Sequence, residues 1–313
     1  MTLIERIESE AARLKQAGVS FGQGTTNAFD EAAWLVLHAL GIGFDELEAQ
    51  ASRVLTPQEE ATATALVTRR IETRQPAAYL TGEAWLQNVP FTVDERVIVP
   101  RSYIAELLAD GEGQGLLDAW LSDQTQRVLD LCTGNGSLAV IAAMAYPEVI
   151  VDACDLSEPA LEVARINVER HRLGGRIRLF ASDLFSAVTA EGRGPYDLIV
   201  CNPPYVNARS MAGLPPEFLA EPRLALDGNP DGSEDGMDLV RRILAEAPTH
   251  LSDIGVLVLE VGHERPHFEH AFRRLEVAWL ETSGGEDQVL VVTADELRRW
   301  WGSRRGAATR GSR

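Results

Sequence analysis

Four short apolar runs that alternate with amphipathic segments constrain the fold of this chain more than any other feature. Each run has the length and β-branched content of a buried strand. The runs span 127–132, 149–154, 176–181 and 196–201. Helical patterns over 136–146 and 157–172 separate the first three. Strands and helices that alternate in this way form a parallel sheet covered on both faces, whose ligands bind beyond the carboxyl ends of the strands.

The chain after residue 202 predicts the rest of the same sheet. A long loop over 206–236 is followed by two helices and three strands. The helices are expected at 237–251 and 266–275, and the strands at 254–261, 276–281 and 288–293. Because only Ser283-Gly-Gly-Glu-Asp287 and a short flank separate the last two strands, no crossover helix fits there. These strands are therefore predicted to pair antiparallel, which is unlike a dinucleotide-dependent dehydrogenase.

The first third of the chain has a different sequence pattern. Helical patterns are expected at 2–17, 28–40 and 57–74, and Thr56-Pro57 with Glu59 is typical of a helix start. We therefore predict four regions in linear order. They are a helical domain over 1–78, a β-hairpin and linker over 79–115, the α/β domain over 116–300, and a disordered basic tail over 301–313.

Composition and charge limit the kinds of partner that the chain is expected to bind. A formal net charge of −18 repels phosphate backbones, which argues against stable nucleic-acid binding and favours basic partners. No apolar run has the length of a membrane span and the first residues do not resemble a signal peptide, so we expect a cytoplasmic protein without membrane contact. His263-Glu-Arg-Pro-His267 matches a zinc motif in letters, but Pro266 opposes the single helix that this motif requires, so we expect no metal site.

Asn202-Pro203-Pro204-Tyr205 follows the fourth predicted strand and is the strongest candidate for a reactive site. The two prolines lack backbone donors but keep their carbonyls, so Asn202 Oδ1 and the Pro203 carbonyl can both accept from one planar NH2 group. Tyr205 offers a flat ring against which a planar target can lie. An ordinary strand-to-loop turn is the alternative, because Asn-Pro often ends a strand.

A glycine-rich loop, Asp130-Leu-Cys-Thr-Gly-Asn-Gly136, closes the first predicted strand. Gly134 and Gly136 let the backbone pass close beneath a ligand, and the start of the next helix favours a negative group such as a carboxylate. Taken alone, the loop also fits the dinucleotide pattern GxGxxG/A.

Acidic residues follow the second and third predicted strands. Asp155 can take both hydroxyls of a ribose, and Asp183, with the Leu184 amide close by, can accept from an adenine amino group. A helix cap is the alternative at these positions, and at the second strand end Ser157 is itself a possible cap.

Together, the four strand ends resemble those of class I S-adenosylmethionine-dependent methyltransferases, and Asn-Pro-Pro-Tyr is similar to the motif of enzymes that methylate planar nitrogens. The helical front, the hairpin and Val99-Pro-Arg-Ser102 resemble the protein N5-glutamine methyltransferases. The branch that modifies ribosomal large-subunit protein three is the most similar, through Gly22-Gln-Gly-Thr-Thr-Asn27, Asp30-Glu-Ala32, Ala78-Tyr-Leu-Thr81, Glu83-Ala-Trp85 and Val93-Asp-Glu-Arg-Val-Ile-Val-Pro-Arg-Ser102. Tyr103 is a departure, because proline is expected there in that branch.

The resemblance implies a Rossmann-like class I methyltransferase fold, S-adenosylmethionine as cofactor, and N5 methylation of a glutamine in that ribosomal protein. Release-factor methylation is the first alternative and a DNA or ribosomal RNA amino-methyltransferase the second; a dehydrogenase and an inactive binding module also stay open. The implied cofactor-binding residues are Asp130, Thr133, Gly134, Asn135, Gly136, Asp155, Leu156, Asp183, Leu184 and Asn202. The implied catalytic residues are Asn202, Pro203 and Tyr205, and the implied substrate-binding residues are Asn202, Pro203, Pro204, Tyr205 and Arg101.

Overall fold

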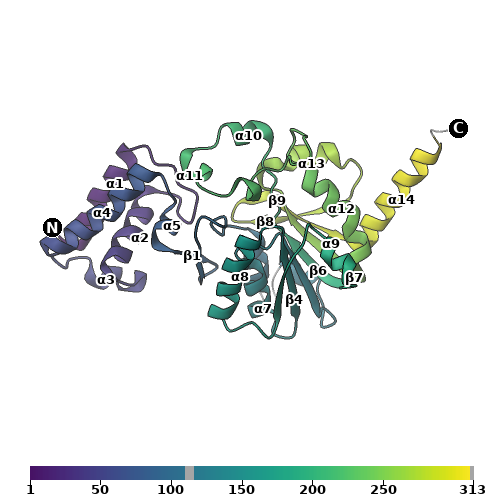
Figure 1. Cartoon of the computed structure of the whole chain (residues 1–313), viewed down its shortest axis with the longest axis horizontal. Coiled ribbons are helices and arrows are strands. Elements are labelled where there is room, and N and C mark those ends of the chain that lie inside the picture. The colour runs from purple at the N-terminus through teal and green to yellow at the C-terminus, as the bar shows by residue number, and fades with distance from the viewer. Residues whose placement is uncertain (110–115, 311–313) are drawn as a thin grey trace. The chain divides into compact units, whose positions relative to one another are not determined.

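The computed structural model of the chain describes residues 1–109 and 116–310 (Figure 1). Two compact units divide the chain, and neither is continuous in sequence. The first contains Met1–Trp85, Thr92–Arg101 and Leu214–Pro222; the second contains Leu86–Phe91, Ser102–Gly213 and Arg223–Arg313. Residues 110–115, the end of the predicted hairpin and linker region 79–115, lie outside the described residues.

Helices build the first unit, as its sequence pattern predicted. They are α1 (Leu3–Gln16), α2 (Ala28–Leu40), α3 (Leu47–Gln50), α4 (Pro57–Thr73), α5 (Ala77–Thr81) and α11 (Pro216–Leu219). The Thr56 side chain accepts from the Glu59 amide and Glu59 reaches back to Thr56, which confirms the predicted start of α4. At the end of α2, Gly41 adopts the left-handed conformation that favours glycine. Leu3, Ile7, Leu35 and Val67 are buried in this unit.

Two segments join the helical unit from outside the predicted range 1–78. Glu217 is fully buried and accepts from Arg74 at 3.0 Å, while Arg70 lies 3.6 Å away. Glu221 is 4% exposed and accepts from Arg101. Buried carboxylates need such partners, so these contacts explain why Leu214–Pro222 belongs to this unit rather than being an open loop.

A short hairpin follows the helices, as predicted. Strands β1 (Glu83–Leu86) and β2 (Val89–Thr92) form a two-stranded sheet. Gln87 and Asn88 connect them, and both have positive φ angles, 49° and 60°, as a two-residue hairpin turn requires.

A seven-stranded sheet with the order β5-β4-β3-β6-β7-β9-β8 organises the second unit. The strands are β3 (Arg127–Leu131), β4 (Ile150–Asp155), β5 (Ile177–Ala181), β6 (Tyr196–Cys201), β7 (Leu251–Glu260), β8 (Ala278–Thr282) and β9 (Gly285–Thr293). β3, β4, β5, β6 and β7 pair in parallel, whereas β9 pairs antiparallel with both β7 and β8. The predicted parallel sheet with an antiparallel carboxyl-terminal pair is therefore confirmed.

The second unit also contains eight α-helices within its described residues. They are α6 (Ile104–Ala109), α7 (Ser137–Ala145), α8 (Glu158–Arg170), α9 (Ser186–Ala190), α10 (Ala208–Ala212), α12 (Asp238–His250), α13 (Arg265–Ala271) and α14 (Ala294–Arg310). Leu129, Ile199 and Leu257 pack in one core with residues of α9, α12, α13 and α14. Alternate strand residues such as Val128 and Val200 are also buried, and α7 contacts β3 and β4. Both faces are therefore covered, as a parallel sheet requires.

The carboxyl-terminal segment differs from its prediction. Instead of being disordered from residue 301, it continues α14 as far as Arg310. Trp300 is buried in the core, and Trp301 Nε1 donates to the Leu244 carbonyl at 2.6 Å. These two large side chains bind the start of the basic segment to α12, while residues 311–313 lie outside the described part. Within the described residues, no helix combines the length and apolar character that crossing a membrane requires.

Candidate active site

The strand register brings the predicted site residues of the second unit to one edge of the sheet. Leu131 lies opposite both Cys154 and Cys201, so the carboxyl ends of β3, β4 and β6 are level. Cys201 also lies opposite Leu259 of β7. Loops that begin at these four strand ends therefore meet at the same edge, where open α/β sheets bind ligands.

Asp130 anchors the loop after β3. Its side chain is fully buried, and its Oδ2 accepts from Thr133 Oγ1 at 2.5 Å and from the Ala139 amide at 3.0 Å. Burial raises the pKa of this carboxyl group to about 7, because desolvation disfavours its charged form. Within residues 1–109 and 116–310, Asp130 Oδ1 and Asn135 Nδ2 are both buried without a hydrogen-bond partner. One acceptor and one donor are therefore left over in the same loop.

The two glycines of this loop have different surroundings. Gly134 has φ +55° with open space where a Cβ would lie, so its backbone can be approached closely, as predicted. Gly136 has φ +80°, and a Cβ on it would lie 3.2 Å from the Ala164 Cβ on α8. Gly136 therefore lies close against α8, and the predicted approach of a ligand to its backbone stays a prediction.

Replacing each glycine by alanine distinguishes the cost of the backbone conformation from the cost of a packing clash. Gly134→Ala is expected to lower the free energy of unfolding by about 1 kcal/mol, because only the left-handed backbone is penalised. Gly136→Ala is expected to cost more, about 2–3 kcal/mol, because the new methyl group also meets Ala164. Urea denaturation measures both values. Equal losses of unfolding free energy in the two variants would show that the contact of Gly136 with α8 does not contribute.

Asp155 orients the loops after β3 and β4. Its Oδ2 accepts from the Gly134 amide at 2.9 Å and its Oδ1 from the Ser157 amide at 2.8 Å. Burial raises the pKa of this carboxyl group, opposed by these backbone hydrogen bonds. Ser157, not Asp155, caps α8 by accepting from the Ala160 amide. The neighbouring Leu156 is 58% exposed, which leaves an apolar side chain at the same strand end.

The two residues predicted after β5 have unequal environments. Asp183 is half exposed and its Oδ1 accepts from Arg242 Nη2 at 2.8 Å. Leu184 is buried with φ +47°, and its carbonyl accepts from Ser182 Oγ at 2.6 Å. The Asp183 carboxylate is therefore already paired with a cation, while the Leu184 side chain belongs to the core.

Asn202 directly follows β6 and is half-buried. Among the side-chain hydrogen bonds of the described residues, none involves Asn202. Pro203 is buried and Pro204 half-buried. The Asn202 amide is thus held by its neighbours in the chain but keeps its own hydrogen-bonding capacity for a ligand.

Tyr205 is held from two sides. Its hydroxyl donates to Glu260 Oε1 at 3.3 Å. Its ring lies against Gly262, where an added Cβ would lie 2.6 Å from Tyr205 Cε2. A glycine is therefore required at position 262 both for this contact and for its own φ of +52°.

Glu260 is the residue that sequence reasoning missed at this edge. It ends β7 one residue after Leu259, the register partner of Cys201, so it lies level with Asn202. Its side chain is 2% exposed, and burial raises its pKa to about 7. The available signal was an acidic residue at the end of a fifth apolar run, the same signal that identified Asp130 and Asp155.

Arg101 lies in the helical unit and is strongly engaged there. Its Nη1 and Nη2 donate to the two Glu221 oxygens at 2.6 and 2.8 Å, and its guanidinium lies 5.5 Å from the centroid of the Phe218 ring. Glu221 also accepts from the Val99 amide at 2.9 Å. Arg101 therefore connects 92–101 to 214–222, and its predicted role in substrate binding stays a prediction.

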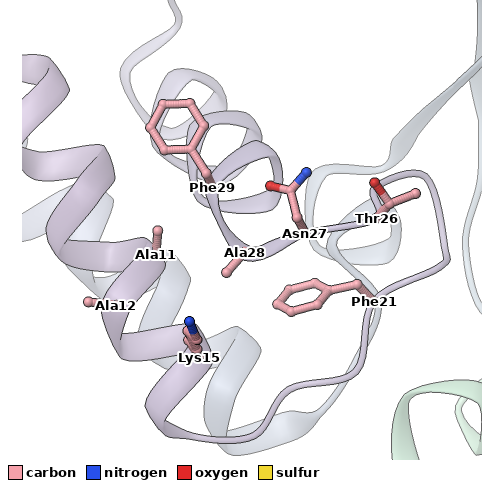
Figure 2. Close-up of a pocket in the computed structure, with 8 residues that line it drawn as sticks. All are labelled: Ala11, Ala12, Lys15, Phe21, Thr26, Asn27, Ala28 and Phe29. Carbon is pink, nitrogen blue, oxygen red and sulfur yellow. The ribbon is translucent and has the colours of Figure 1, made fainter.

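The helical unit has an open pocket of about 510 Å³, where α1 faces the start of α2 (Figure 2). None of the predicted site residues lines it. The lining residues are Ala11, Ala12, Lys15, Phe21, Thr26, Asn27, Ala28 and Phe29.

The histidines of the zinc-like pattern lie on different elements. His263 is in the 3-10 turn Gly262–Glu264, whereas His267 is in α13, which has Pro266 in its first turn. His267 Nδ1 lies 2.5 Å from Glu264 Oε2. In residues 1–109 and 116–310, no three His, Cys, Asp or Glu side chains gather in a way that could hold a metal ion.

Family comparisons cover both units. Residues 9–82 match the PrmC N-terminal domain, and residues 109–229 match the Methyltransferase small domain. The chain is 51% identical to the ribosomal protein uL3 glutamine methyltransferase of Bordetella pertussis, with 95% of this chain and 96% of the relative covered. It is 47% identical to the protein of that name from Burkholderia pseudomallei, over 95% of both chains.

A third protein of the same name, from Bradyrhizobium diazoefficiens, is 46% identical over 95% of this chain and 92% of its own length. These matches confirm the resemblance that the motifs indicated. At such identity over nearly the whole length, the chain belongs to the family of ribosomal protein uL3 glutamine methyltransferases.

Proposed function

We propose that this chain transfers a methyl group from S-adenosylmethionine to the side-chain amide nitrogen of a glutamine in ribosomal protein uL3. The observation that carries this proposal is the unpaired Asn202 amide beside Pro203 at the carboxyl end of β6. The names of the relatives support the choice of substrate, because the similarity extends through the helical unit as well as the sheet.

The residues after β3 fit the amino-acid end of the cofactor. Asp130 Oδ1 is a buried acceptor and Asn135 Nδ2 a buried donor, and neither has a partner within the described residues. An amino acid carries an ammonium and a carboxylate group, the complementary donor and acceptor. We therefore assign this loop, with Thr133, Gly134 and Gly136, to the cofactor. When bound, S-adenosylmethionine supplies an electrophilic methyl group on a sulfonium centre.

The loops after β4 and β5 fit the nucleoside end. Each Asp155 oxygen accepts one backbone amide and keeps capacity for a ribose hydroxyl. Leu156 offers an exposed apolar side chain for the face of a base. Asp183 and the Leu184 backbone are the expected partners of the adenine edge, with Arg242 already beside the Asp183 carboxylate.

Asn202 and Pro203 orient the acceptor. A glutamine amide nitrogen is a weak nucleophile because its lone pair is delocalised into the carbonyl group. If Asn202 Oδ1 and the Pro203 carbonyl accept its two N–H bonds, electron density shifts toward nitrogen and the amide is fixed in one plane. Tyr205 provides the surface against which that plane lies. Holding reactants at attack distance can supply about 7–11 kcal/mol of a reaction barrier, so positioning is sufficient as the main device.

The charge of the chain supports a basic protein partner. A net charge of −18 attracts basic proteins at low ionic strength and repels nucleic acids. Ribosomal proteins that bind RNA are basic, so this charge favours uL3 over an RNA or DNA base as acceptor.

Methyl transfer from labelled S-adenosylmethionine to three separate acceptors tests the proposal. Purified uL3, a release factor, and DNA or ribosomal RNA are compared, and mass spectrometry maps the modified residue. Label on a glutamine of uL3 alone is expected. Label on a release-factor glutamine would support the first alternative, and label on a base would support the second.

A further inference from the structure

Glu260 is a buried carboxyl group that the proposed chemistry does not use. Its Oε2 accepts from Ser102 Oγ at 2.6 Å and from the Tyr103 amide at 2.9 Å, and its Oε1 accepts from the Tyr205 hydroxyl at 3.3 Å. Within the described part of the chain, no Lys, Arg or His forms an ion pair with it. A buried carboxylate without a cation depends entirely on its hydrogen-bond donors.

We infer that Glu260 is a positioning residue, which fixes the Tyr205 ring through its hydroxyl and ties that ring to the two residues before α6. The inference rests on the proposed function, in which Tyr205 provides the surface for the acceptor amide. Glu260 itself does not touch the reacting atoms in this proposal.

The geometry around Tyr205 supports this assignment. The Gly262 backbone lies against the distal end of the ring, where an added Cβ would lie 2.6 Å from Tyr205 Cε2 and 2.9 Å from its hydroxyl oxygen. The hydroxyl at the far end of the side chain has Glu260 as its acceptor. Gly262 limits how far this end of the ring can shift, and the hydrogen bond to Glu260 gives the hydroxyl a fixed direction, so the Glu260 contact contributes to the orientation of the ring.

The hydrogen bonds of Glu260 also show what changes when Tyr103 stands in the place of the expected proline. Its backbone N–H is one of the donors to Glu260, and proline at this position has no such donor. Its ring also lies against the β8–β9 turn, where a Cβ on Gly284 would lie 2.4 Å from Tyr103 Cζ. This chain therefore gives Glu260 a donor that the proline expected in this branch cannot supply.

The hydrogen bond between Glu260 and Tyr205 is expected to depend on pH, because the Glu260 carboxyl group can be protonated. The groups that face Glu260 are the Ser102 and Tyr205 hydroxyls and the backbone amides of Tyr103 and Ile104, all uncharged, and their hydrogen bonds offset only part of the cost of burying its charge. Burial raises its pKa from 4.5 to about 7. Above that pH both oxygens accept; below it one oxygen carries a proton and accepts less well, so the hold on Tyr205 weakens as pH falls.

A double-mutant cycle tests whether Glu260 acts through Tyr205. Glu260→Gln and Tyr205→Phe are each expected to lower kcat for uL3 about tenfold, with binding of S-adenosylmethionine unchanged in calorimetry. The double variant is expected to be no slower than either single variant, because both remove one contact. Multiplying effects in the double variant would overturn the inference. Glu296→Gln, which alters another buried carboxylate of the same unit, is the matched control and is expected to keep full kcat.

A second measurement needs no activity and so separates this inference from the proposed function. The chain has five tyrosines, so ring-carbon NMR of labelled tyrosine is simple, and Tyr205→Phe assigns the relevant signal. In the wild-type chain the Tyr205 phenol carbon is expected to shift with a midpoint near the Glu260 pKa, and in Glu260→Gln to stay constant. A constant wild-type signal would overturn the inference even if uL3 is methylated; a titrating signal would support it even if uL3 is not.

Discussion

Asn202→Ala is expected to lower turnover at least about 100-fold while S-adenosylmethionine still binds with nearly wild-type affinity. The change removes one of the two acceptors proposed for the glutamine N–H bonds, so the acceptor amide loses both its polarisation and its fixed plane. Because the side chain makes no hydrogen bond within the described residues, the substitution breaks no hydrogen bond of the fold. Single-turnover methylation of uL3 and calorimetry of cofactor binding measure the two quantities.

Asn207→Ala is the matched control for this variant. Asn207 lies five positions further along the same segment, caps α10, and its Nδ2 donates to Glu264 Oε1 at 2.6 Å. Its loss is expected to cost about 1 kcal/mol of stability and to keep most of the turnover. Substantial activity in Asn202→Ala would refute the acceptor role, and equal losses in both variants would point to a general disturbance of the loop.

Arg70→Ala is expected to lower the free energy of unfolding by about 3–5 kcal/mol, the largest stability effect that the structure predicts. Arg70 is 1% exposed, and its Nε donates to Glu31 Oε1 at 2.9 Å. Its Nη1 lies 3.6 Å from Glu217 Oε1. Removing the cation takes from the buried Glu31 its ion-pair partner in the described part of the chain and leaves Glu217 with Arg74 alone. Burial already raises the pKa of Glu31 against the attraction of Arg70, so this pKa is expected to rise further in the variant.

The neighbouring Arg69 provides the control for Arg70. It lies on the exposed side of α4, and no ion pair involves it in the described residues. Arg69→Ala is expected to change the free energy of unfolding by less than about 0.5 kcal/mol. Replacing Arg70 and Glu31 together by apolar residues is expected to cost less than Arg70→Ala alone, because no unpaired charge stays behind. A loss for Arg70→Ala as small as that for Arg69→Ala would mean that Glu217 finds enough compensation in Arg74.

The participation of 214–222 in the helical unit also bears on function. This segment begins directly after Gly213, at the end of the stretch that carries Asn202 and Tyr205. Glu217 and Glu221 anchor it through Arg74 and Arg101. The stretch that carries Asn202 is thus connected by chain to a segment whose place depends on buried ion pairs, so the Arg70 variants should also be assayed for turnover.

The amino-acid sequence by itself determined the elements of the sheet, its mostly parallel character and the edge at which the site residues meet. Hydrophobic periodicity is a local property, so the runs over 127–132 and 196–201 could be identified as strands without knowledge of their neighbours. The residues that follow a strand are local too, which is why Asp130, Asp155 and Asn202 could be selected. The antiparallel pairing of β8 with β9 followed from the length of their connection alone.

Only the tertiary structure decided which polar groups meet across long distances in the chain. Ser102 reaches Glu260 over 158 positions, and Arg74 reaches Glu217 over 143. The helical continuation beyond residue 300 likewise depends on the contact of Trp301 with Leu244. A buried charged side chain is stable only when the fold places a partner beside it. Local periodicity does not indicate which residue that partner is. For the same reason, sequence patterns selected the candidate loop after β6, whereas the contacts that hold Tyr205 became visible only in the folded chain.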